Sequence, residues 1–270
     1  MPTLTMMRTL SAILLCLILP VAGAQAAPWI TPDFSISLED LRTMTAGMPQ
    51  DVRDGILARP SAFLDLMAQV LDQPADLLVL VDKQHPLPEG YEPPDLVPLK
   101  DYRLRTTWPN LMLRKSIMPE VLEMVRAARA DGVIITFSST YRSYKYQQGL
   151  FAREVKMYGK EMAERESAHP GFSQHQLGTA IDFGAISDGY EKTPEGRWVS
   201  AHAWEYGFTL SYPPDYEQVT GYRYESWHYR YITRPGARMQ REFFSDVQQY
   251  FLEFLNDNRP LLEQLRMKRG

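Results

Sequence analysis

The ten residues from Ser173 to Asp182 read S-Q-H-Q-L-G-T-A-I-D, and a second stretch, Glu225 to His228, reads E-S-W-H. Together they contribute two histidines and two carboxylates. A catalytic zinc ion takes three protein ligands with nitrogen or oxygen donor atoms and keeps one position open for water. His175, Asp182 and His228 can supply these three ligands. Glu225 is then left to carry a proton, a role that hydrolysis at a metal site requires.

The first stretch has the spacing of a turn that leads into a strand. Gly178 breaks any helix that begins near His175, and Ala180 to Phe183 has the composition of a short strand. Asp182 would lie on that strand, seven residues after His175. A side chain from the turn and a side chain from the strand can converge, so the spacing favours a metal site.

The second stretch lies in a predicted strand that runs from Tyr222 to Ile232. Glu225 and His228 are three residues apart, so in a regular strand their side chains would point to opposite faces of the sheet. If both residues serve one site, a bend or a bulge must lie between them. We therefore expect an irregularity in the backbone between Glu225 and His228.

A polar loop that carries Arg142 follows a predicted buried strand, Val133 to Phe137. Such a loop can deliver a side chain to a cleft. Arg142 can stabilise a developing oxyanion or hold a substrate carboxylate through its planar guanidinium group, and a surface ion pair is the alternative. His169 and His202 are the competing metal ligands. However, His169 precedes a turn outside the motif, and His202 lies in a predicted helix, Trp198 to Gly207.

The other predicted elements are mostly helices with an apolar stripe. They are a helix behind Pro60 (Phe63 to Leu71), a short strand (Leu77 to Val81), helices Met118 to Ala128 and Tyr144 to Val155, a strand at Phe208 to Tyr212, and a C-terminal helix from Phe243 to Leu255 closed by Asp257, Asn258 and Pro260. The proline-rich residues Lys83 to Leu96 form a loop. We expect the helices near the N-terminus to pack on the main domain. The alternative is that they contact a partner or cover the active site.

The N-terminus has the pattern of a secretory signal peptide. Arg8 precedes an apolar run, Leu10 to Val21, and the sequence Ala24 to Ala26 fits a cleavage site. The apolar run is short for a transmembrane helix, although an uncleaved anchor is the alternative. We expect a mature chain that has no transmembrane span and no cysteine, because Cys16 lies inside the signal. Its stability must then come from its core or from a metal.

The overall composition is that of a globular protein. Hydrophobic residues make up 44% of the 270-residue chain and charged residues 23%, and the net charge is −4. No long basic run is present in the sequence, so nothing in it indicates a nucleic-acid partner. Nothing in the sequence fixes an oligomeric state.

Several motifs follow one another between Leu77 and Ile232. They are Leu80 to Lys83 with His85-Pro86-Leu87 and Tyr91 to Leu96; Tyr141-Arg142-Ser143-Tyr144 with Gln147; Pro170 to Asp182; Tyr206-Gly207-Phe208; Thr220-Gly221-Tyr222; and Glu225 to Tyr231. In this order they resemble the motifs of the VanY-type D-alanyl-D-alanine carboxypeptidases, within the LAS group of zinc peptidases. The resemblance covers more than half of the chain.

The resemblance implies both a fold and a set of site residues. The implied fold is α+β, a small antiparallel sheet flanked by helices, with helical extensions at the two ends. The implied cofactor is Zn²⁺ on His175, Asp182 and His228, with Glu225 as the catalytic base and Arg142 as a stabiliser of the transition state. Three further residues are expected to contact the substrate: Ser173, Gln147 and Trp227.

Two residues depart from the family pattern. Asp82 stands where the family usually has asparagine, and Ser226 stands where proline usually precedes Trp-His. Neither change removes a metal ligand or the base. We expect Ser226 to loosen the turn that brings Glu225 towards the metal.

We predict four segments and one main function. The segments are a signal peptide (1–26), a helical N-terminal extension (27–75), a zinc peptidase domain (76–233) and a C-terminal helical extension (234–270). The expected function is removal of the terminal D-alanine from peptidoglycan stem peptides by a secreted or periplasmic enzyme. The alternatives are an L,D-carboxypeptidase, a D,D-dipeptidase or an endopeptidase on the same peptides, a non-catalytic peptidoglycan-binding module, and an exported domain without a metal.

Overall fold

The computed structural model describes residues 29–267 of the chain. The predicted signal peptide therefore lies outside the described residues. Within 29–267, no helix combines the length and the apolar composition needed to cross a bilayer. The division into four segments remains a prediction.

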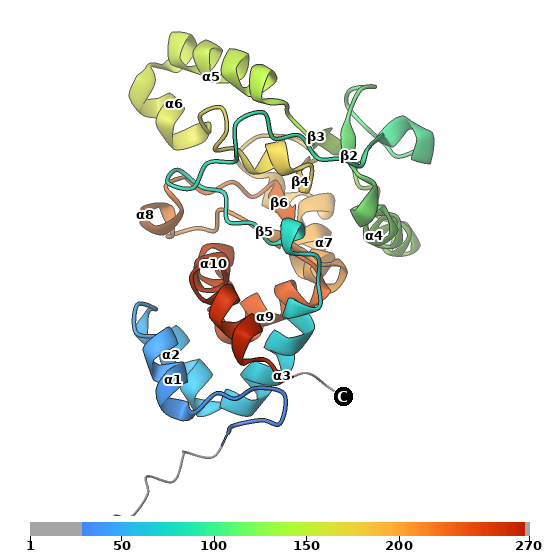
Figure 1. The fold of residues 1–270 in the computed structure, drawn as a ribbon. Coiled ribbons are helices and arrows are strands. Elements are labelled where there is room, and N and C mark those ends of the chain that lie inside the picture. Colours follow the sequence, from blue (N-terminus) through green and yellow to red (C-terminus); the bar gives the residue numbers. More distant parts are fainter. Residues whose placement is uncertain (1–28, 268–270) are drawn as a thin grey trace, which may run out of the picture.

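A four-stranded antiparallel sheet forms the centre of the molecule (Figure 1). Its strands, in spatial order, are β3 (Phe137–Ser139), β4 (Ala180–Phe183), β6 (His228–Tyr231) and β5 (Phe208–Leu210). A smaller antiparallel pair joins β1 (Leu96–Pro98) to β2 (Met112–Arg114). The predicted α+β fold with a small antiparallel sheet flanked by helices is confirmed.

One face of the four-stranded sheet is covered by helices. Ile181 and Phe183 alternate along β4 with Ala180 and Asp182, so the two pairs face opposite sides. The apolar pair belongs to a buried cluster with residues of α4 (Met118–Ala130) and α7 (Pro194–His202). The opposite face carries Asp182 and is free of this apolar layer, which leaves it available for polar side chains.

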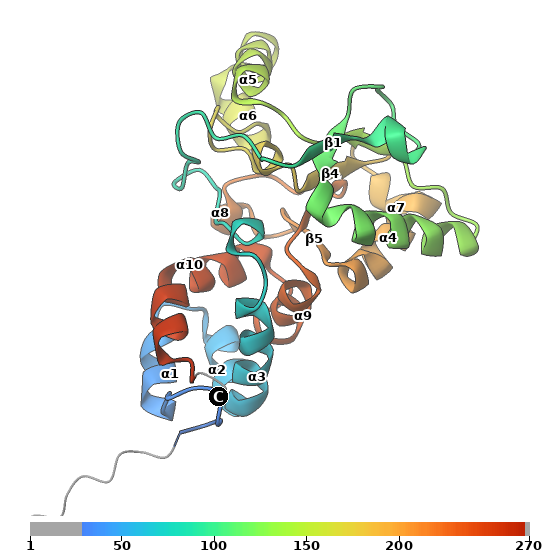
Figure 2. The ribbon, with the colours of Figure 1, turned by 45° about the vertical axis from the view of Figure 1, so that its right-hand side comes forward.

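The N-terminal and C-terminal helices pack into one second core, which both views place at the end of the molecule away from α5 (Figures 1 and 2). Its helices are α1 (Leu38–Met44), α2 (Gln50–Ala58), α3 (Pro60–Leu71), α9 (Arg234–Phe243) and α10 (Gln248–Leu265). The ring of Phe63 lies 5.3 Å from that of Phe243 and 5.6 Å from that of Phe254, edge to face. Burial of each such ring contributes about 2 kcal/mol, so the two chain ends stabilise each other.

At the other end, α5 (Tyr144–Tyr158) and α6 (Lys160–Glu166) form a pair that projects beyond the sheet (Figures 1 and 2). The hydroxyl of Ser143 accepts a hydrogen bond from the Tyr146 amide and so caps α5 at its start. The predicted start of this helix near Tyr144 is confirmed. A short helix, α8 (Glu217–Thr220), precedes the last strand.

Two predicted strands are wrong. Leu77 to Val81 begins at the end of a 3-10 turn and then runs without a ladder partner, because the carbonyls of Leu77 and Val79 accept hydrogen bonds from Arg230. The strand predicted at Val133 to Phe137 begins only at Phe137. Its pairing with β4 covers few residues, and the Thr136 amide donates to the carboxylate of Glu195 instead of to a strand.

The single C-terminal helix predicted from Phe243 to Leu255 is also wrong. The chain breaks between α9 and α10, where Ser245 and Asp246 take positive φ angles of 52° and 58°. The side chain of Gln240 donates to the carbonyl of Asp246 at 2.9 Å and holds this turn. Pro260 does not close α10 but lies inside it. The helix instead ends near Leu265, at the edge of the second core.

Candidate metal centre and active-site cleft

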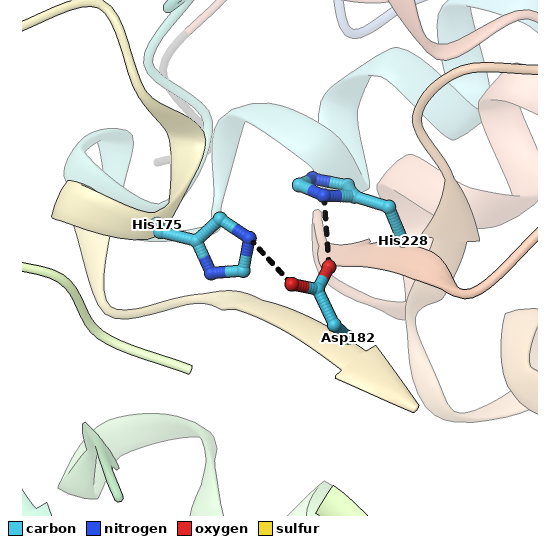
Figure 3. Close-up of side chains that lie close together, drawn as sticks. All are labelled: His175, Asp182 and His228. Atoms are coloured by element: carbon cyan, nitrogen blue, oxygen red, sulfur yellow. Dashed lines mark ion pairs between the residues drawn. The ribbon is translucent and has the colours of Figure 1, made fainter. Parts of the chain in front are cut away.

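Two of the three predicted metal ligands lie opposite each other on neighbouring strands. Asp182 of β4 pairs with His228, the first residue of β6, so both side chains point to the same face of the sheet (Figure 3). His175 reaches the same point from a 3-10 turn, Gln174–Leu177, that directly precedes β4. The turn ends at Gly178, whose φ of +68° reverses the chain.

Only glycine fits well at position 178. A Cβ atom there would lie 3.0 Å from a methyl group of Leu96 and 3.1 Å from the Cγ of Arg114, in addition to its strained φ. The turn therefore packs closely against the strand pair β1–β2. This close packing fixes where His175 enters the site.

The three side chains converge closely (Figure 3). The Nε2 atom of His175 lies 3.3 Å from Oδ2 of Asp182, and the Nδ1 atom of His228 lies 3.1 Å from Oδ1 of the same carboxylate. The two imidazole rings are almost perpendicular, with centroids 4.8 Å apart. One ligand atom from each residue falls within 4.8 Å of the others.

This donor set fits a zinc ion. Among the described residues, Nε2 of His175 and Oδ1 of Asp182 are buried without a hydrogen-bond partner. Such orphaned groups are costly unless something binds them. Ligand atoms about 2.0–2.2 Å from a tetrahedral zinc lie roughly 3.3 Å from one another. The two histidine–carboxylate separations, 3.3 and 3.1 Å, are close to that. Two histidines with one carboxylate form a known catalytic set.

Hydrogen bonds on the far side of each ring fix which nitrogen faces the site. Nδ1 of His175 donates to the carbonyl of Thr140 at 2.7 Å, which leaves the lone pair of Nε2 directed at the cluster. Nε2 of His228 lies 3.2 Å from Oε1 of Gln174, which leaves Nδ1 directed at the cluster. Outer partners of this kind orient ligating histidines in metal sites.

The charge states of two ligands suit a cation. Burial and the nearby guanidinium of Arg142 lower the pKa of His175 to about 4, so its imidazole is neutral at pH 7. Burial opposes ionisation of Asp182, but the interactions with His175, His228 and Arg142 outweigh it and hold the pKa of this carboxyl well below its usual value. The cluster therefore presents an anion and a neutral imidazole, the forms that bind metal.

Glu225 lies beside the cluster but is not one of its three converging residues. Its Oε2 is 3.5 Å from Nδ1 of His228. Burial, followed by the charge of Asp182, raises the pKa of Glu225 to about 8. A divalent cation at the cluster would lower the pKa of Glu225, because its positive charge favours the carboxylate. A buried carboxyl with a raised pKa next to a metal site has the properties of a proton carrier.

The predicted irregularity between Glu225 and His228 is a tight turn. The His228 amide donates to the carbonyl of Glu225 at 3.1 Å, and β6 begins only at His228. The Glu225 amide in turn donates to the carbonyl of Tyr212 at 3.2 Å. These two hydrogen bonds hold the turn that contains Ser226. We expected Ser226 to loosen this turn, because the family usually has proline at that position.

Arg142 points at the metal cluster from the end of β3. Its guanidinium donates to Oδ2 of Asp182 at 2.7 Å and to the hydroxyl of Ser139 at 3.0 Å. Its side chain is 18% exposed, so this ion pair lies at the cleft and not on the open surface as the alternative supposed. The free part of the guanidinium can face a bound carbonyl or carboxylate.

A cleft of about 800 Å³ opens over these residues. Ser173 and Trp227, two of the predicted substrate contacts, line it together with Arg142 and Glu225. Gln147, the third, does not line it. Its side chain is fully buried and donates to the carbonyl of Ala168 at 2.8 Å, behind the wall of the cleft.

The competing histidines lie outside the cluster. His169 pairs with Glu164 at 2.9 Å, and His202 pairs with Glu205 at 3.0 Å. Neither belongs to the group of ligand atoms that converge in the described part of the chain. This placement agrees with the sequence-based preference for His175 and His228.

Sequence reasoning missed the residues that support the site. Gln174 and Ser139 hold His228 and Arg142 in place, and the ring of Tyr212 lies 4.7 Å from that of His228. Gln174 is adjacent to His175, so the sequence places it near the site. The sequence does not predict that Gln174 contacts His228. Tyr212 gave no sequence sign, because its contact depends on how β5 and β6 are placed.

Asp82, the other departure from the family pattern, forms hydrogen bonds that connect two segments of the chain. Its carboxylate accepts hydrogen bonds from the backbone amides of Gln84 and His85 and from the side chain of Gln249 on α10. Burial opposes ionisation, but these bonds lower the pKa of Asp82. The carboxylate thus ties the proline-rich loop to the C-terminal helix.

Comparison with known proteins identifies the family. Residues 110–234 match the VanY family, described as D-alanyl-D-alanine carboxypeptidase. The chain is 35% identical over 190 residues to YodJ of Bacillus subtilis, assigned as a carboxypeptidase, and covers 70% of it with 68% of its own length. This chain belongs to the VanY family. It is also 32% identical over 172 residues to VanXYC of Enterococcus gallinarum, a bifunctional D-Ala-D-Ala dipeptidase and carboxypeptidase, with 60% of this chain matched to 86% of that protein.

Solved VanY-type structures share the fold. The LdcB LD-carboxypeptidase superposes with a TM-score of 0.59 at 32% identity over 66% of this chain and 86% of that one. A glutamate-to-alanine variant of the vancomycin-resistance D,D-pentapeptidase VanY, solved in complex with Zn(II), gives a TM-score of 0.56 at 32% identity, over 66% of this chain and 99% of that one. With its His175, Asp182 and His228 cluster, this VanY-family chain is a zinc metallopeptidase.

Proposed function

We propose that this protein is an exported D,D-carboxypeptidase that removes the terminal D-alanine from peptidoglycan stem peptides. One observation carries the proposal: a buried carboxyl, Glu225, and a guanidinium, Arg142, flank the cluster that fits zinc at the base of an open cleft. Membership of the VanY family supplies the substrate class. The Glu225 side chain also argues against a non-catalytic binding module.

The side chains at and beside the metal cluster have distinct parts in hydrolysis. His175, Asp182 and His228 would hold a zinc ion, which would lower the pKa of the attacking water and polarise the scissile carbonyl. Glu225 takes a proton from the attacking water on its carboxylate as the water oxygen bonds to the carbonyl carbon. It then passes that proton to the nitrogen of the departing D-alanine as the C–N bond breaks. Arg142 donates to the oxygen on which negative charge develops.

Export is the second part of the proposal. The pattern of residues 1–26 supports a cleaved signal peptide, and stem peptides lie outside the cytoplasm. A secreted or periplasmic location places the enzyme with its substrate. Detection of the mature N-terminus near residue 27 in the exported fraction supports this location, and retention of residues 1–26 contradicts it.

An L,D-carboxypeptidase is the second candidate. The LdcB LD-carboxypeptidase and the VanY D,D-pentapeptidase are each 32% identical in sequence to this chain. The two activities share the metal and the base and differ in the stereochemistry of the residue before the scissile bond. The metal cluster therefore serves either activity.

Digestion of purified muropeptides tests the proposal and separates the candidates. We expect the mature protein to remove one alanine from pentapeptides, as seen by mass spectrometry, and to lose this activity in EDTA. Loss of alanine only from tetrapeptides would identify an L,D-carboxypeptidase. Cleavage within the stem or the cross-link would identify an endopeptidase. Binding without cleavage of any muropeptide would overturn the proposal.

Replacement of Arg142 tests its part in catalysis. We expect Arg142→Met to lower kcat by roughly a hundredfold or more, because the variant loses a donor aimed at the developing charge. Steady-state kinetics on a pentapeptide, with zinc content measured in parallel, gives the result. Arg165→Met is the control, since Arg165 forms an exposed ion pair with Glu217. A kcat near wild type in the Arg142 variant would contradict this role.

A further inference from the structure

A buried chain of amide groups leads away from the zinc ligand His228. Oε1 of Gln174 lies 3.2 Å from Nε2 of His228 and also accepts from the hydroxyl of Ser211 at 2.7 Å. The other end of the Gln174 amide, Nε2, donates to Oε1 of Gln248 at 3.4 Å. Gln174, Ser211 and Gln248 are each at most 4% exposed.

The far end of this chain is anchored on the backbone of β5. Nε2 of Gln248 donates to the hydroxyl of Thr209 at 2.7 Å and to the Thr209 carbonyl at 3.3 Å. A carbonyl can only accept, so it fixes which end of the Gln248 amide faces Thr209. The oxygen of that amide must then face Gln174.

The order of donors and acceptors along the chain determines the proton position on His228. Because Gln248 presents an oxygen, Gln174 presents its NH₂ group to Gln248 and its oxygen to His228. An oxygen 3.2 Å from Nε2 requires a proton on Nε2, which leaves Nδ1 of His228 with a lone pair for the metal. The opposite tautomer would place two acceptors against each other in a buried site.

We infer that Gln248, the first residue of α10, is a positioning residue for the zinc ligand His228. It acts through Gln174 by holding the imidazole in the Nε2–H tautomer and at a fixed orientation. Gln248 lies outside residues 110–234, the part of the chain that matches the VanY family. The inference rests on the proposed zinc site but not on the identity of the substrate.

The position of Gln248 joins the site to the second core. Further along the same helix, Phe251 and Phe254 are fully buried in that core with the N-terminal helices. The helix is thus held by apolar packing at a fixed distance from the sheet, and Gln248 bridges the two. The C-terminal helices therefore support the metal ligand and do not only cover the sheet.

Zinc affinity of the mature protein tests the inference without reference to activity. We expect Gln248→Met, which keeps the volume but removes both polar ends, to weaken zinc binding by roughly three- to tenfold in competition with a chromophoric chelator. Gln248→Glu should restore affinity close to wild type, because a protonated carboxyl can donate to Thr209 and accept from Gln174. In the zinc-loaded protein, the Nε2–H proton of His228 should exchange with solvent slowly in wild type and faster in Gln248→Met.

The neighbouring residue provides a matched control. Gln249 is also buried and donates to Asp82 at 2.7 Å and to Glu253 at 2.8 Å. Among the described residues, its side chain forms no hydrogen bond with Gln174, Ser211 or Gln248. We expect Gln249→Met to lower Tm and to leave zinc affinity unchanged. Equal zinc affinity in Gln248→Met and wild type would overturn the inference, and so would equal weakening in the two methionine variants. Weakened zinc binding in a protein that cleaves no muropeptide would leave the inference standing and reject the proposed function.

Discussion

Replacing Glu225 with glutamine lowers kcat for release of the terminal alanine by about a thousandfold, while the protein keeps its zinc. The amide has nearly the same shape as the carboxyl but cannot take a proton from water, and loss of a general base costs roughly 10²–10⁴ in rate. Zinc is retained because the cluster of His175, Asp182 and His228 does not include Glu225. Single-turnover kinetics on a pentapeptide and metal analysis measure the two effects.

The control is the same glutamate-to-glutamine substitution at the surface of the protein. Glu217→Gln removes an exposed carboxylate that pairs with Arg165, and its kcat should match that of wild type. If Glu225→Gln retains more than about a tenth of the wild-type kcat, Glu225 is not the general base. If that variant loses zinc, Glu225 contributes to metal binding and its role must be reassigned.

Removal of zinc abolishes activity and lowers Tm by an amount on the order of 10 °C. The metal binds the folded state, so free zinc at about 1,000 times its Kd stabilises that state by about 4 kcal/mol. In a domain of this size, 1 kcal/mol corresponds to roughly 2–4 °C in Tm. The physical source is local, because Nε2 of His175 and Oδ1 of Asp182 are buried with no hydrogen-bond partner in the described part of the chain.

Differential scanning calorimetry with EDTA, followed by added zinc, measures this change and its reversal. His175→Ala is the matched variant, since it deletes one ligand and should show no rise of Tm when zinc is added. An EDTA-treated protein as heat-stable as the zinc-loaded one would contradict the prediction. That result would favour the alternative of an exported domain without a metal.

The chemistry of the site could be predicted from the sequence because its signals are local. A glycine turn and a short strand separate His175 from Asp182, and both features depend on neighbours along the chain. The same holds for the helix that starts at Tyr144, where Ser143 is the cap. The family resemblance implied the same proton-carrying role for Glu225. For Arg142 it favoured stabilisation of the transition state over the surface ion pair that the local pattern left open.

The errors in the predicted elements have a common physical cause. Val133 to Phe137 has strand composition, but a strand also needs a partner, and β4 offers one only at Phe137. The apolar stripe from Phe243 to Leu255 is continuous in sequence. Its helix breaks at Ser245 and Asp246 because the chain must turn there to bring α10 against the N-terminal helices.

The sequence by itself determined the donor atoms and the turn-and-strand setting of the site, since these follow from residue type and short-range patterns. The family resemblance added the α+β class. Tertiary structure alone decided that Asp182 lies opposite His228 across two strands 46 residues apart in sequence, and that Gln248 reaches the zinc ligand through Gln174. The reason is physical. Cross-strand register and buried hydrogen-bond chains depend on how distant segments pack, and no local pattern records which distant residue will complete them.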